Sequence, residues 1–217
     1  MHVENDGREY VARCACLSTR AALRRIEKSG LGPLLGDCTF DNFMAKSPWQ
    51  KQVKATAQKF TKADPQVSWL FFGGQVGAGK THLCTAAVAE YLRRGKHVKY
   101  MLWRDESVSL KATVNDDEAY AREINPLKKV EVLYIDDFFK TEQGKTPTTA
   151  DINLAFEILN YRYNNRELIT IISSEHTVDD LIAFDEAVGS RILQRSEGYC
   201  CVIEEGQGRN HRLKGVL

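Results

Sequence analysis

The sequence predicts an α/β fold in which a five-stranded parallel sheet is sandwiched between helices. Two observations predict it. From residue 68 onward, short apolar runs alternate with helical segments, the pattern of a parallel sheet joined by right-handed crossovers. The first of these runs leads directly into a glycine-rich stretch at residues 74–81 and then into a helix-compatible segment, which is the context of a phosphate-binding loop.

The size and charge of the chain limit what it can be. Its 217 residues suffice for one sizeable α/β core, or for a core with a small appendage. A formal net charge of +1 excludes a global polycation, so any contact with nucleic acid must come from a local patch. No apolar run is long enough to cross a bilayer, and the first residues lack the apolar core of a signal peptide. We therefore expect a cytoplasmic protein without a membrane partner.

The N-terminal residues 1–17 carry no strong periodicity, and we expect them to be extended or loosely held. Cys14 and Cys16 would supply half of the four ligands that a structural zinc site needs. His2 and Cys38 are the only nearby candidates for the other half, so a complete zinc site within this chain is not expected. Buried thiols are the expectation for Cys84, Cys200 and Cys201.

Two helices should precede the sheet region. Ser18 is a candidate N-cap for a short basic helix at residues 19–28, and residues 31–42 have the glycine, proline and aspartate content of a connector. A second helix should begin with Ser47 as N-cap and Pro48 at its first position, and end at Asp64.

The remaining elements follow from alternating patterns and caps. Candidate strands lie at residues 68–72, 97–102, 130–135, 168–173 and 199–203. Helices are expected after the phosphate-binding loop as far as Gly95, at residues 153–162, at residues 178–184 behind Thr177 as N-cap, and at residues 186–195. Residues 103–129 are polar and predict one or two helices.

Residues 74–81 match the pattern G-x-x-x-x-G-K-[ST] without a mismatch. Glycines in such a loop let the backbone pass close to phosphate oxygens, and the following helix adds its positive dipole end. Lys80 would reach the β- and γ-phosphates of ATP or ADP, and Thr81 would place its hydroxyl on Mg²⁺. The predicted nucleotide-binding residues of this segment are Gly74, Val76, Gly77, Ala78, Gly79, Lys80, Thr81 and His82. The alternative is a glycine-rich turn with an incidental lysine.

Two acidic residues follow the third candidate strand. A buried parallel strand that ends in acid delivers a carboxylate into the ligand crevice. Asp136 is therefore expected to hold Mg²⁺, directly or through water. Asp137 stands where hydrolysing enzymes of this kind usually carry glutamate to orient the attacking water. Because aspartate is one methylene shorter, either the water sits differently or hydrolysis is slow.

The fourth candidate strand ends in Ser173, Ser174 and Glu175. In a P-loop protein of the ASCE type this strand lies beside the first, so its polar end would approach the γ-phosphate. Ser174 is the candidate polar sensor, and Glu175 could help to position water. A serine pair at a strand end can equally be a helix-entry cap.

Late arginines complete the set of candidates. Arg191 and Arg195 are spaced i, i+4 on one helix face. Such a pair is a solvated face or, beside an ATP site, a source of a guanidinium that neutralises the γ-phosphate of a neighbouring subunit. Arg212 could fold back on the nucleotide in the same chain, or belong to a solvated basic tail.

Together these residues resemble the DnaC-type replicative helicase loaders, a branch of the AAA+ ATPases close to the DnaA initiators and the IstB transposition helpers. The resemblance covers nearly the whole chain. It depends on the phosphate-binding loop and on the phrases at residues 29–31, 39–43, 135–137, 160–163, 171–175, 190–192 and 211–213. It implies an AAA+ P-loop core without a separate C-terminal lid at residues 46–217. Residues 1–45 would form an N-terminal extension, a possible remnant of a zinc-ribbon module that binds the helicase, with its linker.

The resemblance also implies an activity. Such proteins are ATP-switched assemblies that load the hexameric replicative helicase onto single-stranded DNA and self-associate through the ATP site. By position, Ser174 resembles sensor 1, Arg191 or Arg195 the arginine finger, and Arg212 sensor 2. The segment at residues 103–129 would approach single-stranded DNA.

Two other functions remain open at this point. An IstB-like partner of a transposase would share the same core and differ in what it recruits. A small-molecule P-loop kinase would need a lid and an acceptor-binding segment, which the sequence does not reveal.

Overall fold

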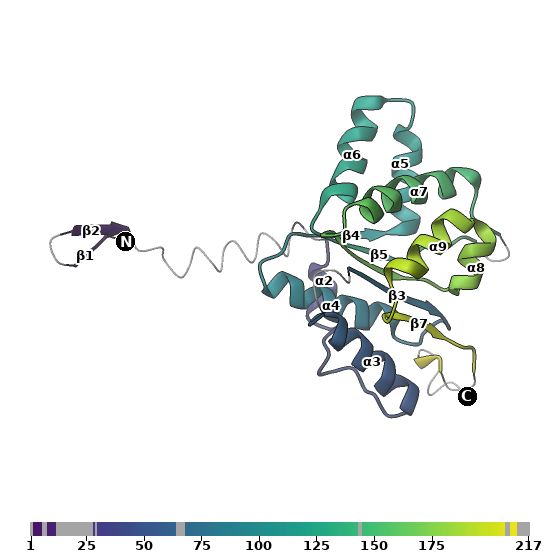
Figure 1. The fold of residues 1–217 in the computed structure, drawn as a ribbon, viewed down its shortest axis with the longest axis horizontal. Coiled ribbons are helices and arrows are strands. Elements are labelled where there is room, and N and C mark those ends of the chain that lie inside the picture. Colours follow the sequence, from purple (N-terminus) through teal and green to yellow (C-terminus); the bar gives the residue numbers. More distant parts are fainter. Residues whose placement is uncertain are drawn as a thin grey trace.

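The computed structural model describes residues 2–5, 8–11, 28, 30–63, 68–142, 145–206 and 209–211. Its main feature is a five-stranded sheet in the order β4-β5-β6-β3-β7, in which every neighbouring pair is parallel (Figure 1). The strands are β3 (Trp69–Gly74), β4 (Val98–Leu102), β5 (Val132–Asp136), β6 (Ile169–Ser173) and β7 (Cys200–Ile203). All five predicted strands are confirmed. Their ends differ from the prediction by no more than two residues.

Helices cover both faces of the sheet because side chains of successive strand residues point to opposite faces. Leu70 and Phe72 of β3 pack with one group of helices, whereas Trp69 and Phe71 pack with the other. The first face is covered by α2 (Gly32–Leu35), α3 (Pro48–Phe60) and α4 (Lys80–Arg93). The second is covered by α5 (Trp103–Thr113), α6 (Asp117–Lys129), α7 (Thr149–Asn164), α8 (Val178–Phe184) and α9 (Glu186–Arg195). The sheet is therefore buried on both sides, as the sequence predicts.

Helix starts follow the caps in the sequence. α3 begins at Pro48, and α8 begins after Thr177, whose side chain accepts from Asp180 N. α7 begins at residue 149 rather than at the predicted 153, because Thr148 and Asp151 form a reciprocal capping box. The connector at residues 31–42 also differs from the prediction, since it contains the single turn α2 with Pro33 in its first turn.

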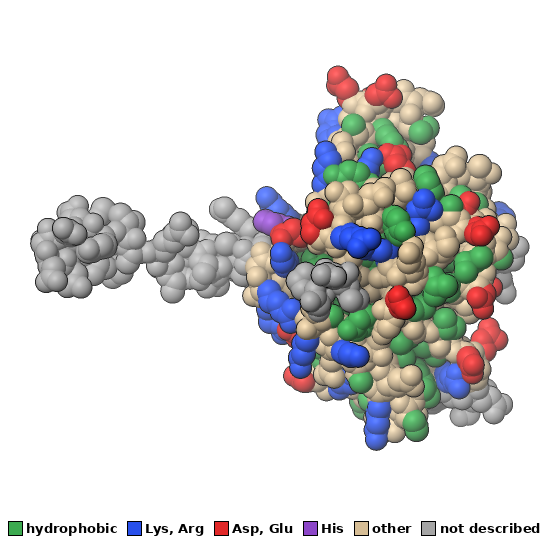
Figure 2. Space-filling model, in the orientation of Figure 1, with side chains coloured by type: hydrophobic (Ala, Val, Ile, Leu, Met, Phe, Trp, Pro, Cys, Tyr) green, Lys and Arg blue, Asp and Glu red, His purple; other side chains and the backbone are tan. Residues whose placement is uncertain are grey.

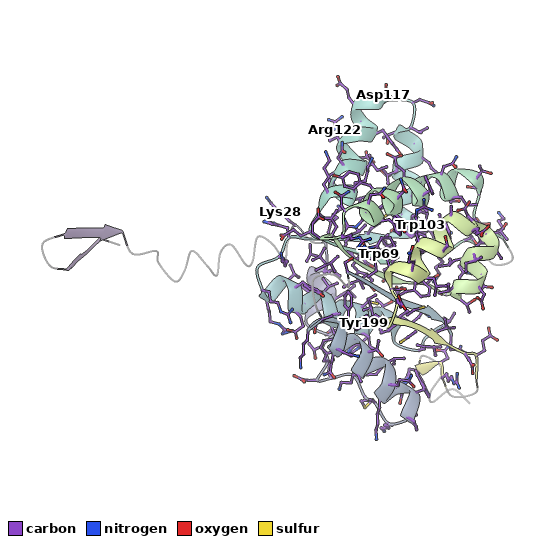
Figure 3. The ribbon with its side chains drawn as sticks, in the orientation of Figure 1. Lys28, Trp69, Trp103, Asp117, Arg122 and Tyr199 are labelled. Carbon is purple, nitrogen blue, oxygen red and sulfur yellow. The ribbon has the colours of Figure 1, made fainter. Side chains whose placement is uncertain are left out.

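Residues 103–129 form two helices, α5 and α6, joined as a hairpin whose outer end projects beyond the sheet (Figure 1). The second helix starts where the Asp116 side chain accepts from Ala119 N at 3.0 Å. Figure 3 shows Asp117 at the outer end of the hairpin and Trp103 at its inner end, close to the sheet. Figure 2 shows acidic side chains at this outer end.

Near the N-terminus, β1 (His2–Asn5) and β2 (Arg8–Val11) form an antiparallel pair. The expected helix at residues 19–28 lies outside the described residues except for Lys28, and Cys14 and Cys16 also lie outside them. None of the helices that the structure describes is long and apolar enough to cross a membrane.

Candidate functional site

The phosphate-binding loop joins β3 to α4 at the carboxyl edge of the sheet, the edge where its parallel strands end (Figure 1). Gly74, Gly77 and Gly79 have φ angles of 91°, 70° and 89°, which side chains disfavour. A Cβ on Gly74 would lie 2.2 Å from the Ile203 carbonyl oxygen, and one on Gly77 would lie 2.0 Å from Asn210 Oδ1. The loop therefore needs glycine both for its conformation and for close packing.

Lys80 is almost completely buried at the start of α4, with 7% of its surface exposed. Its ammonium donates hydrogen bonds of 2.7 Å to the carbonyl oxygens of Gly74 and Gln75. Burial lowers the pKa of Lys80, and the nearby carboxylates of Glu175 and Asp137 oppose this effect. A bound phosphate would replace the two carbonyl oxygens as the acceptor for this cation.

Asp136 lies at the end of β5 and accepts hydrogen bonds from three neighbouring elements. Thr81 Oγ1 donates to Asp136 Oδ1 at 3.0 Å, and Ser173 Oγ at the end of β6 donates to the same oxygen. Tyr100 OH of β4 donates to Asp136 Oδ2 at 3.1 Å. Thr81 and Asp136 are hard oxygen ligands at hydrogen-bond distance, so they suit Mg²⁺.

Sequence reasoning missed Ser173 and Tyr100. Ser173 directly precedes the serine that was proposed as the sensor, so the strand end itself was the available signal. Tyr100 reaches Asp136 because β4 is the neighbour of β5, with Leu102 opposite Asp136. Burial raises the pKa of Tyr100, and the Asp136 carboxylate raises it further, so this hydroxyl stays a donor at neutral pH.

A pocket of about 170 Å³ opens beside the loop. Its lining residues are Val76, Gly77, Gly79, Lys80, Thr81, His82, Asp137 and Glu175. The fold thus brings most of the predicted nucleotide-binding residues together with the acid that follows β5. Gly74 and Ala78 are not in the lining, and Ala78 is buried beneath the loop.

Ser174 lies behind the pocket and is completely buried. Its hydroxyl donates to the Phe138 carbonyl oxygen at 2.7 Å and accepts from His176 N at 3.0 Å. These bonds fasten the segment after β6 to the turn after β5. The role of Ser174 as a sensor stays a prediction, whereas Ser173 contacts the proposed Mg²⁺ ligand directly.

Segments that precede β3 and follow β7 in the sequence lie against the loop and the start of α4. His82 Nε2 lies 2.8 Å from the Thr39 carbonyl oxygen, and the His82 ring meets Phe43 edge to face at 5.3 Å. Near the C-terminus, His211 N donates to the Gly77 carbonyl oxygen at 2.9 Å. Arg212, the candidate sensor 2, lies outside the described residues.

Arg191 and Arg195 lie away from the loop, toward the amino edge, where the strands begin. Arg195 donates to Ser68 Oγ just before β3 and, at 3.3 Å, to the carbonyl oxygen of Arg166 just before β6. The Arg191 guanidinium lies over the Phe156 and Tyr163 rings of α7. The fold therefore does not bring these arginines to the phosphate-binding loop of their own chain.

Known proteins are similar to this chain in sequence. Phage-like element PBSX protein XkdC of Bacillus subtilis (strain 168) is 33% identical over 227 residues, covering 99% of this chain and 83% of that protein. Replicative helicase loader DnaC of Escherichia coli (strain K12) is 30% identical over 124 residues, covering 56% of this chain and 51% of DnaC. The chain thus matches about half the length of DnaC.

Solved structures agree on the fold. A crystal structure of the DnaC helicase loader superposes with a TM-score of 0.64 at 21% identity, covering 79% of this chain and 98% of that one. Residues 32–216 match the family described as IstB-like ATP binding protein. This match includes the whole sheet, the phosphate-binding loop and Asp136. The chain therefore belongs to the IstB-like family of ATP-binding proteins, with the AAA+ fold of DnaC.

Proposed function

We propose that this protein is an ATP-switched AAA+ loader that helps to place a hexameric replicative helicase on single-stranded DNA. The observation that carries the proposal is the hydrogen-bonded set of Thr81, Asp136 and Ser173 beside Lys80, in a chain with a DnaC relative. Such a set holds a nucleoside triphosphate with its metal ion. Because the DnaC match covers 56% of this chain, it supports the ATP-dependent part of the proposal more than the identity of the partner.

In this function Lys80 binds the β- and γ-phosphates, and Thr81 with Asp136 would hold Mg²⁺. Bound there, Mg²⁺ would supply positive charge against the phosphate oxygens. Tyr100 and Ser173 orient the Asp136 carboxylate by donating to its two oxygens. The backbone N–H groups of the loop and the N-terminal end of α4 add further donors to the phosphates.

Hydrolysis requires an acceptor for the proton of the attacking water. Asp137 and Glu175 both line the pocket, so either carboxylate can accept it. Because Asp137 has a shorter side chain than glutamate, we expect turnover to be slow. The protein would then act as a switch with a long ATP-bound state.

The arginine that completes the site comes from a neighbouring copy in this proposal. Arg195 and Arg191 both lie toward the amino edge, away from the loop at the carboxyl edge of the same chain. Their distance from their own phosphate-binding loop supports action on a neighbour. ATP would therefore promote self-association through its own binding site.

The test is binding to the hexameric replicative helicase of the same organism, measured by pull-down with Mg²⁺ and either ATP or ADP. We expect helicase capture with ATP and at least about tenfold less with the Lys80→Ala variant, since this change removes the phosphate-binding cation. Lys62→Ala is the matched control, because Lys62 is exposed near Arg93 and Arg94 at the C-terminal end of α4, whereas the pocket lies at the N-terminal end of this helix. Nucleotide binding without helicase capture would reject the loader role.

A second candidate is support of a transposase, because the matching family is described as IstB-like. The ATP site would work in the same way and only the recruited protein would differ. A parallel pull-down with a transposase from the same genome separates the two. Capture of the transposase alone would replace the loader role. The third open alternative, a small-molecule kinase, gains no support from the family match.

A further inference from the structure

Lys140 links the two carboxylates that face the pocket. Its ammonium lies 3.0 Å from Asp137 Oδ2 and 2.7 Å from Glu175 Oε1. Asp137 follows β5 and Glu175 follows the adjacent β6, so one lysine connects the ends of two strands. The three side chains are 28–30% exposed, which places them at the pocket surface rather than beneath it.

The turn that carries Lys140 is firmly held. Asp137 and Phe139 have φ angles of 52° and 58°, which are unfavourable for residues other than glycine. Phe138 and Phe139 are completely buried, and both rings contact Trp103. Lys140 N donates back to the Asp137 carbonyl oxygen at 2.9 Å. The backbone therefore fixes the position from which Lys140 returns toward the pocket.

Lys140 offsets part of the negative charge at this edge of the sheet. Three carboxylates gather here, from Asp136, Asp137 and Glu175, against the ammonium groups of Lys80 and Lys140. Asp137 and Glu175 share the pocket with Lys80 and would repel a phosphate bound there. Burial would lower the pKa of Lys140, but its hydrogen bonds to Glu175 and Asp137 raise it, so the ammonium is charged at neutral pH.

We propose that Lys140 is a positioning residue that makes the pocket accept the terminal phosphate of a nucleoside triphosphate. It holds Asp137 and Glu175 apart from that phosphate and cancels part of their charge. A diphosphate lacks the group that these carboxylates would repel, so its binding depends less on Lys140. Lys140 thus contributes to the discrimination of ATP from ADP. This inference rests on the proposed function, because it assumes that the pocket binds a nucleotide.

The same contacts use one carboxylate oxygen of each acid and leave the other available. Lys140 occupies Asp137 Oδ2 and Glu175 Oε1. Among the described residues, nothing donates to the second carboxylate oxygen of either side chain. One oxygen on each acid therefore remains available to accept a hydrogen bond from water, and Lys140 fixes its orientation.

The experiment compares the affinities of the full chain for a non-hydrolysable ATP analogue and for ADP, by calorimetry with Mg²⁺. We expect Lys140→Met to weaken the ATP analogue about tenfold and ADP less than about twofold. Lys140→Arg should restore most of the difference, since it keeps the charge. Lys145→Met is the matched control, because Lys145 forms the same i, i+3 ion pair with Glu142 on the exposed part of this loop.

A second variant tests the inference independently of any loss of stability. Glu175→Gln removes one of the repelling charges, so we expect it to strengthen binding of the ATP analogue and to leave ADP nearly unchanged. Equal weakening of both nucleotides by Lys140→Met, or weaker ATP binding by Glu175→Gln, would overturn the role of Lys140 and leave the loader function standing. Failure of the unmodified chain to bind either nucleotide would instead overturn the proposed function itself.

Discussion

Cationic side chains have different partners at the two edges of the sheet. At the carboxyl edge, Lys140 forms ion pairs with acids of the same chain, and burial lowers the pKa of Lys80 while neighbouring acids oppose this effect. At the amino edge, the guanidinium groups of Arg162 and Arg195 donate to neutral oxygens. The first edge is therefore close to charge balance, whereas these two arginines of the second edge have no carboxylate as a hydrogen-bond partner among the described residues.

Arg162 is the more deeply buried of these two arginines. It is completely buried, and it donates to Thr170 Oγ1 at 2.9 Å. It also donates to four carbonyl oxygens, those of Leu127, Lys128, Val130 and Ile169. Burial lowers the pKa of this guanidinium to about 9, so it is still a cation at neutral pH. Its charge stabilises the fold through dipoles rather than through an ion pair.

Arg195 differs from Arg162 because it is only partly buried. Burial and the neighbouring Arg166 guanidinium both lower its pKa. A phosphate of a nucleotide bound to a second copy would offset the repulsion between Arg195 and Arg166. It would also replace Ser68 Oγ and the Arg166 carbonyl oxygen as the acceptor for Arg195. The amino edge thus has a positively charged side chain that could bind a phosphate of a partner. The cations of the carboxyl edge already lie against acids of their own chain.

The largest expected effect tests this difference directly. Arg195→Ala should lower ATP turnover of the assembled protein about a thousandfold, as loss of an arginine finger does. Nucleotide binding by the monomer should change less than twofold. Steady-state turnover measured against protein concentration checks the first expectation, and fluorescence titration of dilute protein checks the second.

Two companion variants interpret that result. Arg93→Ala is the matched control, because Arg93 is exposed at the C-terminal end of α4, on the side of the sheet where the strands begin. Arg191→Ala decides which member of the pair acts as the finger. If Arg195→Ala abolished binding by the monomer, the side chain would act on its own nucleotide and the comparison of the two edges would be wrong.

Loss of the buried cation should be the next largest effect. Arg162→Met leaves five acceptors without their donor, so we expect the free energy of unfolding to fall by about 3 kcal/mol. Urea denaturation measures it. Arg166→Met, at an exposed position, should change it by less than about 0.5 kcal/mol. Similar values for the two variants would show that the buried hydrogen bonds add nothing to stability.

Two adjacent serines separate binding from stability at the carboxyl edge. Ser173→Ala removes a donor to Asp136 and should weaken Mg²⁺-dependent ATP binding about tenfold, with metal-free binding unchanged. Ser174→Ala removes the tie to Phe138 and should cost about 1 kcal/mol of stability without changing affinity. Calorimetry and thermal unfolding of both variants measure these quantities. A larger loss of affinity in Ser174→Ala would restore the sensor role to Ser174.

The smallest effect concerns Asp151, at the N-terminal end of α7. Burial would raise its pKa, but hydrogen bonds from Lys111 and Thr148 lower it below its usual value. A depressed pKa in the folded state stabilises the protein above the unfolded value near 3.9, and this contribution is lost as the pH falls through the folded value. Asp151→Asn should therefore cost about 1 kcal/mol at pH 7 and make stability less sensitive to acid.

A matched variant separates the lysine from the cap. Asp180 caps α8 with Thr177 in the same way, and no lysine in the described part of the chain pairs with it. Asp180→Asn should reproduce the loss of the cap without the part due to Lys111. Urea titrations at pH 3, 5 and 7 provide the comparison. Identical pH profiles for the two variants would contradict the contribution of the lysine.

Local pattern was enough to predict the sheet, the loop and Asp136. Each of these depends on residues that are close in sequence: an apolar run, a glycine-rich turn, or an acid at a strand end. The site residues at positions 76, 77, 79–82 and 137 lie together as the motif predicts. The start of α7 was missed because its capping box lies in a polar stretch without helical periodicity.

Contacts between distant segments could not be predicted in the same way. Tyr100 and Lys140 reach the site because of the strand order and of a turn with two unfavourable φ angles, neither of which leaves a pattern in the sequence. Arg162 belongs to a helix whose other side chains predict burial, but a lone arginine in such a helix is usually exposed. Its five acceptors belong to other segments of the chain.

These acceptors show that Arg162 joins the α5–α6 hairpin to the sheet. The outer end of the α5–α6 hairpin projects beyond the sheet (Figure 1). At its inner end, Arg162 donates to the carbonyl oxygens of Leu127 and Lys128 in the last turn of α6. Because the same guanidinium donates to the Ile169 carbonyl oxygen at the start of β6, one side chain fastens the base of the hairpin to the sheet. Four residues farther along the chain, the Arg166 carbonyl accepts from Arg195. The base of the hairpin and Arg195 are therefore held at the same edge of the sheet.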